Sequence, residues 1–251
     1  MKYFISNCRK KLKSDSSLFW VAMRSNQLAD IASGVEDDFK KSLKIMKTDL
    51  TTDGWILPQL ESNMRNQINI ANIKVEQNST GYGYQMQSTL TKLESGTNIV
   101  GEVPTLFSVR NSSDWSLWKD VKEYVLKHCL QEMTKKDKNN IVVLHDHYSG
   151  FKDVGMVLKR LMKDKTVIEY PSSEGKQKDI NNLKDFMRKD DTILFTRNYY
   201  FDGYEASNII YLYSGDCGLR NGLLRAVNNV TCIQVGSHAK ISGMKEDRSW
   251  Y

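Results

Sequence analysis

Two short polar segments near the C-terminal end of the chain carry the residues best suited to chemistry. Gly203-Tyr204-Glu205 precedes an apolar, β-branched run, and Leu223-Leu224-Arg225-Ala226 precedes a second such run about twenty residues later. Glycine has no Cβ, so a loop at Gly203 can approach a ligand closely. Arginine is a planar, permanently charged donor fork, which suits the charge that develops in phosphoryl transfer. Residues of these types are suited to a loop that contacts a charged ligand.

A second polar group, His145-Asp146-His147, follows the apolar run IleValValLeu. Two histidines around an aspartate could bind a metal, but a further ligand is needed, and neither His128 nor His238 can be placed there from sequence. We interpret the segment as a strand-to-loop turn and predict no metal site. A nuclease or small-molecule enzyme that uses these three residues remains a minor alternative.

Three tyrosines lie beside or within the first motif: Tyr199, Tyr200 and Tyr204. Tyrosine rings can stack on the bases of single-stranded nucleic acid, and such stacking contributes about 1–3 kcal/mol per base. Ordinary packing of the rings is the alternative. We predict a weak nucleic-acid contact there and leave packing open.

Composition narrows the class of protein only slightly. The chain has 251 residues, with 36 basic and 30 acidic residues and a net charge of +6, which favours anionic partners mildly and favours solubility equally. The four cysteines lie too far apart in the sequence for a zinc site. We interpret them as reduced thiols and predict an intracellular protein, cytoplasmic or nuclear. No apolar run approaches the roughly 18 residues of a membrane span, so we predict no membrane partner.

The N-terminal part of the chain has mixed patterns. An apolar run at residues 18–23 indicates a buried strand, and residues 35–48 alternate charged and apolar positions as an amphipathic helix does. We predict another helix over residues 57–73. Residues 74–97 are rich in Gln, Ser, Thr, Gly and Tyr and are interpreted as a linker.

From residue 103 onwards, apolar runs alternate with helical stretches. We predict strands at residues 105–109, 141–145, 166–170, 192–196, 208–213 and 230–235. We predict helices at about residues 113–134, 150–163 and 180–189. This alternation is typical of an α/β fold with a mostly parallel, doubly wound sheet. Ligands are then expected at the carboxyl ends of the strands.

The motifs together resemble those of UvrD-like superfamily-one helicases. In that family a Gly-x-Glu loop precedes one strand, and an Arg-Ala helix precedes the next. AsnMetArgAsn at 63–66 resembles the family's Asn-Tyr-Arg motif, and residues 19–27 resemble a degraded strand that ends in Gly-Asp-x-x-Gln. The similarity covers about residues 18–240 and implies a RecA-like second lobe.

The resemblance assigns a role to each matching residue. Arg225 and Arg65 become phosphate-facing catalytic arginines, Gln27 a γ-phosphate sensor, Glu205 a ribose or metal-side contact, and Gly203 the close-approach position of a nucleotide-binding loop. Each also has a structural alternative, such as a helix cap, an ion pair or a surface position. We expect Gly203, Glu205 and Arg225 to lie at one edge of the sheet, with Arg225 exposed.

The chain also departs from the family pattern. No GxxxxGK[ST] phosphate cradle and no acidic metal motif is present, Arg24 or Ser25 stands where the family has aspartate, and Asp202 stands where it has lysine. We therefore expect this chain alone to be inactive, with ATP and magnesium bound only in a complete two-lobe protein.

The same resemblance implies a domain organisation. Residues 1–56 would be a remnant of the first lobe or a helical extension, residues 57–97 a helix and linker, and residues 98–251 the RecA-like second lobe. The expected partner is the missing first lobe or a longer parent chain, which would make this chain a fragment or a truncated form. The alternative is a non-catalytic, helicase-derived interaction or signalling module, because a fold alone does not fix a function.

Overall fold

The chain divides into two units. They are Met1–Leu60 with Tyr84–Thr91, and Glu61–Gly83 with Lys92–Tyr251. The computed structural model describes part of the second unit: residues 62–63, 66–76, 94–95, 97–109, 114–136, 140–146, 149–171, 176–201, 203–214, 219–236 and 240–247. The elements predicted at 18–23 and 35–48, the predicted N-terminal helical extension, and residues Gln27 and Arg65 lie outside the described residues.

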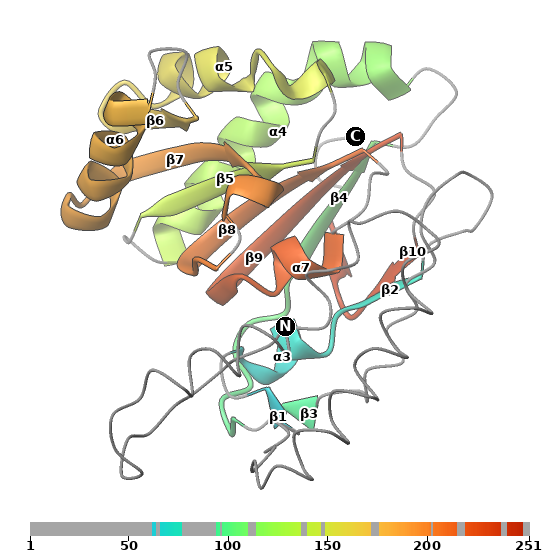
Figure 1. The fold of residues 1–251 in the computed structure, drawn as a ribbon. Coiled ribbons are helices and arrows are strands. Elements are labelled where there is room, and N and C mark those ends of the chain that lie inside the picture. The colour runs from blue at the N-terminus through green and yellow to red at the C-terminus, as the bar shows by residue number, and fades with distance from the viewer. Residues whose placement is uncertain are drawn as a thin grey trace, which may run out of the picture. The chain divides into compact units, whose positions relative to one another are not determined.

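A sheet of seven strands, all parallel, forms the centre of the described unit (Figure 1). Its strands, in spatial order, are β11 (Lys245–Glu246), β4 (Thr105–Val109), β9 (Ala226–Val235), β8 (Ala206–Tyr213), β5 (Ile141–His145), β7 (Thr192–Arg197) and β6 (Thr166–Tyr170). The predicted α/β class is confirmed, and the arrangement is that of a RecA-like fold. All six strands predicted after residue 103 are present, and β11 is an additional short strand at the edge.

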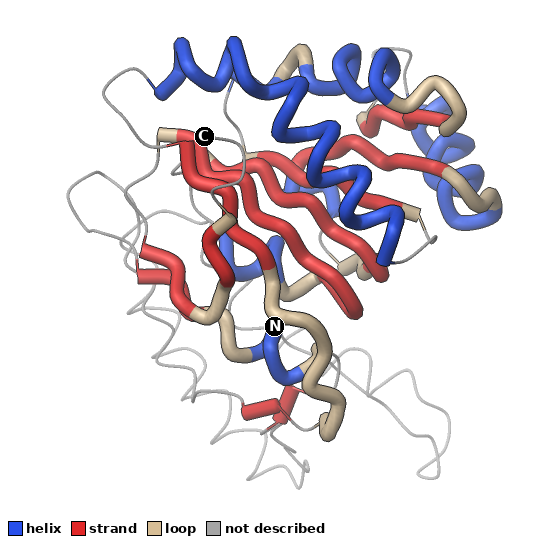
Figure 2. The backbone as a smooth tube through the Cα atoms, turned by 180° about the vertical axis from the view of Figure 1, so that it is seen from behind, coloured by secondary structure: helices blue, strands red, loops and turns tan. Residues whose placement is uncertain are grey.

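Helices cover both faces of this sheet. On one face lie α4 (Asp114–Lys136), η2 (Ser149–Phe151) and α5 (Val154–Leu161), which Figure 2 shows from behind. On the other face lie α6 (Lys176–Arg188), η3 (Asn198–Phe201) and α7 (Leu219–Leu223). The predicted helices 113–134, 150–163 and 180–189 correspond to α4, to η2 with α5, and to α6. None of the described helices is long and apolar enough to cross a bilayer.

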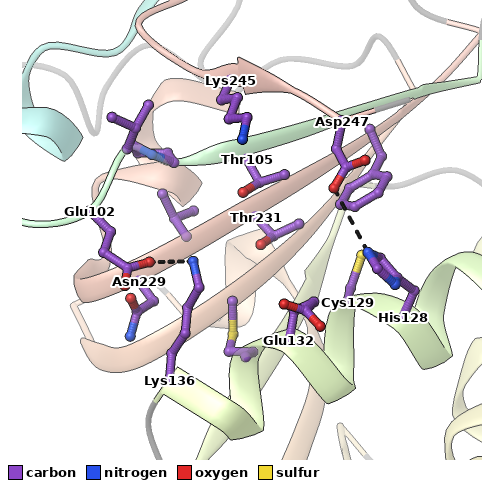
Figure 3. Close-up of a pocket in the computed structure, with 15 residues that line it drawn as sticks. Glu102, Thr105, His128, Cys129, Glu132, Lys136, Asn229, Thr231, Lys245 and Asp247 are labelled. Carbon is purple, nitrogen blue, oxygen red and sulfur yellow. Dashed lines mark ion pairs between the residues drawn. The ribbon is translucent and has the colours of Figure 1, made fainter. Parts of the chain in front are cut away.

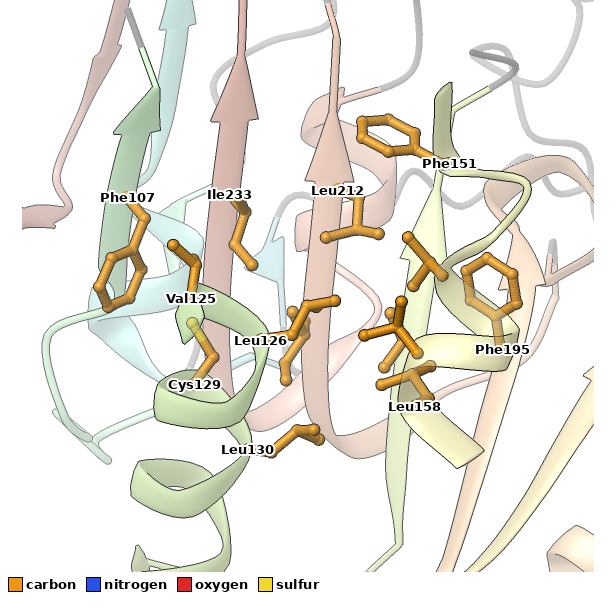
Figure 4. Close-up of a cluster of buried hydrophobic side chains, with 14 of the residues drawn as sticks. Phe107, Val125, Leu126, Cys129, Leu130, Phe151, Leu158, Phe195, Leu212 and Ile233 are labelled. Atoms are coloured by element: carbon orange, nitrogen blue, oxygen red, sulfur yellow. The ribbon is translucent and has the colours of Figure 1, made fainter. Parts of the chain in front are cut away.

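The alternation of side chains along the strands supplies two cores. In β5, Ile141 and Val143 face α4 and α5, whereas Val142 and Leu144 face the opposite layer. Successive side chains of a strand point to opposite faces, so a strand that is apolar throughout must be covered on both sides. Figure 4 shows the first core, in which Leu126 of α4 packs with other apolar side chains of α4, α5 and the strands.

The helix predicted over 57–73 is wrong at residues 62–63, which form a strand, and the described residues contain only the short helix α3 (Ile68–Ala71) in that range. The predicted linker over 74–97 lies mostly outside the described residues. Two small strand pairs involve the residues described in this region. The pairs are β1 (Ser62–Asn63) with β3 (Glu94–Ser95), and β2 (Lys74–Glu76) with β10 (Lys240–Ser242). Ile70 and Ile73 are fully buried in the second core. Two apolar residues three positions apart would also lie on one face of a longer helix, so their spacing does not distinguish the two conformations. Residues 74–76 form a strand because they pair with residues 240–242, and the periodicity of a local sequence does not reveal a partner so far away in the chain.

Candidate functional site: the amino-terminal edge of the sheet

The structure brings Glu205 and Arg225 together at one edge of the sheet. Ala206 and Ala226 are paired at the first residues of β8 and β9, and the Ala206 N–H donates to the Arg225 carbonyl at 3.2 Å. Because the strands are parallel, the two residues before them lie side by side. This is the amino-terminal edge, so the expectation of a site at the carboxyl ends is wrong for these two residues.

Arg225 is buried, with 3% of its surface exposed, so the prediction that it is exposed is wrong. It lies in the tight turn between α7 and β9, and its N–H donates to the Gly222 carbonyl at 3.2 Å. Leu223 and Ala226, on either side of the turn, are completely buried in the second core. Since both ends of the turn are drawn into the core, the side chain between them is enclosed as well.

Asn66 joins this turn from a distant part of the sequence. Its side-chain amide donates to the carbonyls of Leu224 at 3.0 Å and of Ala226 at 2.6 Å, on either side of Arg225. Only 1% of Asn66 is exposed. The AsnMetArgAsn segment therefore contacts the LeuLeuArgAla segment directly. Arg65 was the residue predicted to act in this motif, and Asn66 was not predicted, although an asparagine beside a motif arginine was the available signal.

A β-bulge extends the polar edge into β9. Between its pairings with Ala206 and Asn208, β9 carries one more residue than β8. A bulge re-aims side chains, and here Asn228 accepts from the Gln67 amide at 3.5 Å. Asn229 donates to the Asn208 side chain at 2.8 Å. Side-chain amides thus link β8, β9 and the segment before α3.

Gly203 and Glu205 form the open part of the edge. Gly203 has φ +88°, a left-handed conformation that glycine adopts without steric cost, and a Cβ there would meet no atom within 4 Å. The backbone conformation explains why glycine occupies position 203, and the space where a Cβ would stand is open to a ligand. Glu205 is exposed. The described residues contain no group of three or more His, Cys, Asp and Glu side chains that could hold a metal ion.

Two of the three tyrosines predicted to stack on bases lie apart from Glu205 and Arg225, whereas Tyr204 precedes Glu205 directly. Tyr199 and Tyr200 belong to η3, which follows the carboxyl end of β7, and they are 74% and 37% exposed. Their ring centroids lie 5.5 Å apart, and Tyr200 also contacts Tyr170 at 5.9 Å. Tyr204 packs beside Phe201 with the ring centroids 5.7 Å apart. The predicted site residues are therefore divided between two edges of the sheet.

The HisAspHis segment lies at the carboxyl edge, where its described residues make structural contacts. The Asp146 carboxylate is 5% exposed and accepts from the Ser214 N–H at 2.6 Å and from the Ser214 hydroxyl at 2.7 Å. This contact ties the end of β5 to the end of β8. His145 stacks on Phe195 at a centroid distance of 4.8 Å. His147 lies outside the described residues.

Comparison with known proteins assigns no family. No family model and no curated protein matches the chain. A solved structure described as the C-terminal domain of a possible DNA helicase from Lactobacillus (strain WCFS1) is similar to it. The similarity has a TM-score of 0.33 and 13% identity, and it covers 55% of this chain and 76% of that one. It is a weak likeness to a helicase C-terminal domain and carries no residue-level assignment.

Proposed function

We propose that this chain acts as the C-terminal lobe of a helicase-like nucleoside triphosphatase and presents the amino-terminal edge of its sheet to a nucleotide held by another lobe. The contact of Asn66 with the carbonyls beside Arg225 carries the proposal. It joins two segments that resemble helicase motifs and that lie about 160 residues apart. Pairing of Ala206 with Ala226 adds Glu205 from a third such segment.

The chemistry assigned to this edge is positioning and charge stabilisation. Phosphoryl transfer depends mainly on groups that neutralise the developing charge, and an arginine supplied from a second lobe contributes about 10³–10⁵ in rate. The exposed Glu205 would contact the ribose or the metal side of the nucleotide. Arg225 is enclosed in the present state, so the proposal requires its side chain to turn outward when a nucleotide docks against the edge.

A non-catalytic interaction module on the same fold is the second candidate. The burial of Arg225 favours it, because an arginine enclosed beside a helix end can serve stability alone. The chain also contains no phosphate-cradle motif. In such a module Asn66 and Arg225 would stabilise the fold, and exposed surface residues would contact the partner.

The reading frame upstream of Met1 separates the two candidates. The helicase proposal predicts that it encodes a lobe with a phosphate cradle, and that the joined protein hydrolyses ATP with magnesium, whereas residues 1–251 alone do not. In the joined protein, Arg225→Ala should lower kcat by about 10³-fold or more with little change in nucleotide affinity. Arg225→Lys is the matched control, because it keeps the charge and loses the planar fork.

Two results would contradict the helicase proposal. One is an upstream frame without any phosphate-cradle lobe. The other is an Arg225→Ala protein that is folded by circular dichroism and turns over normally. Either result would put the interaction module ahead.

A further inference from the structure

A cavity of about 570 Å³ lies between α4 and the face of the sheet that α4 covers (Figure 3). Its walls are the C-terminal half of α4, the strands β4, β9 and β11, and the segment before β4. Pockets that take small molecules have volumes of about 300–1,000 Å³. The cavity is therefore large enough for a metabolite of a few carbon atoms.

One wall of the cavity is a row of three polar side chains. Lys245 is paired with Thr105, and Thr105 with Thr231, across the neighbouring parallel strands β11, β4 and β9. Paired residues of parallel strands share a face and stand about 4.8 Å apart. Figure 3 shows the Lys245 side chain pointing into the cavity toward Thr105. The row offers one ammonium group and two hydroxyl groups to a single ligand.

Backbone hydrogen bonds fix this row in place. The Lys245 N–H donates to the Pro104 carbonyl at 2.7 Å, and the Asp247 N–H donates to the Leu106 carbonyl at 2.9 Å. These bonds hold β11 in register on β4. The position of the ammonium group therefore depends on a paired strand and not on a loop.

The charges around the cavity leave Lys245 as the one lining cation, among the residues the structure describes, that is in no ion pair. Each lining carboxylate has a basic partner: the pairs are Glu102–Lys136, Glu132–Lys135 and Asp247–His128. The Lys135 ammonium lowers the pKa of the Glu132 carboxyl. The lining carboxylates are thus engaged, whereas the ammonium of the polar row is available to an anion.

The cysteine of the cavity is not suited to nucleophilic catalysis. It is Cys129, the one cysteine among the described residues that line the cavity, and it is 2% exposed. Burial, reinforced by the nearby Asp247, raises the pKa of that thiol well above its ordinary value, so it stays protonated at neutral pH. A protonated thiol is a poor nucleophile.

We propose that this cavity binds a small metabolite through one oxyanion group, a phosphate or a carboxylate. Lys245, Thr105 and Thr231 hold the oxyanion, because an ammonium and two hydroxyls supply the donors that its oxygens require. Glu132 on α4 and Glu102 on the segment before β4 are each in an ion pair, and their carboxylate oxygens can still accept from hydroxyl groups elsewhere on the ligand. This site does not depend on the helicase proposal: Asn229 of the amino-terminal edge lines the cavity, but it is not one of the three residues that hold the oxyanion.

Calorimetric titration with three probes tests the site. Ribose 5-phosphate and gluconate each carry one oxyanion, and ribose carries none. Saturable binding of at least one anionic probe below about 10 mM, with none for ribose, is the expected result, and which anion binds identifies the oxyanion class. No binding of either anion, or equal binding of ribose, would overturn the proposal.

Two variants and a control locate the binding. Lys245→Gln should weaken the anion by about tenfold or more, since it removes a charged donor, and Thr231→Val should weaken it by about threefold to tenfold. Lys127→Gln changes an exposed lysine on α4 that does not line the cavity, and it should not change the affinity for the anion. Urea unfolding checks that each variant is folded. An equal loss of affinity for the anion in Lys245→Gln and Lys127→Gln would show adventitious binding to surface charge and would refute the site.

Discussion

The two edges of the sheet use polar groups differently. At the amino-terminal edge, the Asn66 amide holds backbone carbonyls beside the buried Arg225, and the contacts are between neutral groups. At the carboxyl edge, the buried carboxylate of Asp146 accepts two hydrogen bonds from Ser214. Exposed aromatic rings such as Tyr199 follow the carboxyl end of β7. The hydrogen bonds described at one edge come from neutral side-chain amides, and those at the other edge go to a carboxylate.

This difference separates the two contacts that we propose, one with a nucleotide and one with single-stranded nucleic acid. β5 has five residues, and at about 3.3 Å per residue it places the two edges roughly 16 Å apart. Variants at one edge should leave the other edge unaffected, which makes each assignment separately testable.

The largest expected effect is at the carboxyl edge. Asp146→Ala should lower the free energy of unfolding by about 3 kcal/mol, because hydrogen bonds to a charged group contribute about 1.5–3 kcal/mol each. Urea unfolding measures it. Ser214→Ala, which keeps the backbone N–H, should cost only about 1 kcal/mol. An Asp146→Ala protein as stable as the parent would show that the charge does not close this edge.

The next effect is at the amino-terminal edge. Asn66→Ala should lower the free energy of unfolding by about 2 kcal/mol, since two carbonyls in or near the core lose their donor. Asn69→Ala is the matched control: Asn69 donates to the Gly101 carbonyl at 3.0 Å in an exposed position. Its loss should cost less than about 1 kcal/mol. Equal losses in the two variants would contradict a special role for the Asn66 contact.

A smaller effect concerns nucleic-acid binding. Tyr199→Ala should weaken binding of a single-stranded oligonucleotide by about 1 kcal/mol, the lower end for one base stacked on a ring. Fluorescence anisotropy measures it, and affinity should fall steeply with salt. Tyr124→Ala on α4 removes a ring that is 57% exposed and serves as the control. Unchanged affinity in Tyr199→Ala would leave the exposed rings without this role.

The smallest expected effect separates the neighbours Glu205 and Arg225. Glu205→Gln should change the free energy of unfolding by less than about 0.5 kcal/mol, because the side chain is exposed. Arg225→Met should be clearly destabilising, because Arg225 is buried and has interaction partners. Thermal unfolding compares them. Similar losses in both variants would mean that Glu205 also supports the fold, and its proposed ligand role would weaken.

Local patterns were sufficient to predict the central sheet. The runs at 141–145 and 192–197 are apolar at every or nearly every position, and only a strand covered on both faces buries such a run. The same logic could not find β11, whose two residues Lys245 and Glu246 are charged and exposed. β11 exists because its backbone completes that of β4, and a hydrophobic pattern does not record this pairing.

The candidate site was predicted only in part for the same reason. The order of loop, strand and helix was enough to place Glu205 and Arg225 before neighbouring strands. It did not show that Arg225 is enclosed, because burial in a turn depends on how both of its ends pack. The Asn66 contact spans about 160 residues, and the cavity beside Lys245 needs β11. Both are consequences of tertiary structure.

The central claim is that the amino-terminal edge of the sheet faces a nucleotide. The most direct measurement is a titration of the ¹⁵N-labelled chain with magnesium and a non-hydrolysable ATP analogue, followed by amide chemical shifts. The claim predicts weak, saturable shifts at Gly203, Glu205, Arg225 and Ala226, with none at Asp146 or Ser214. Shifts confined to the carboxyl edge, or no saturable shifts at millimolar analogue, would contradict it.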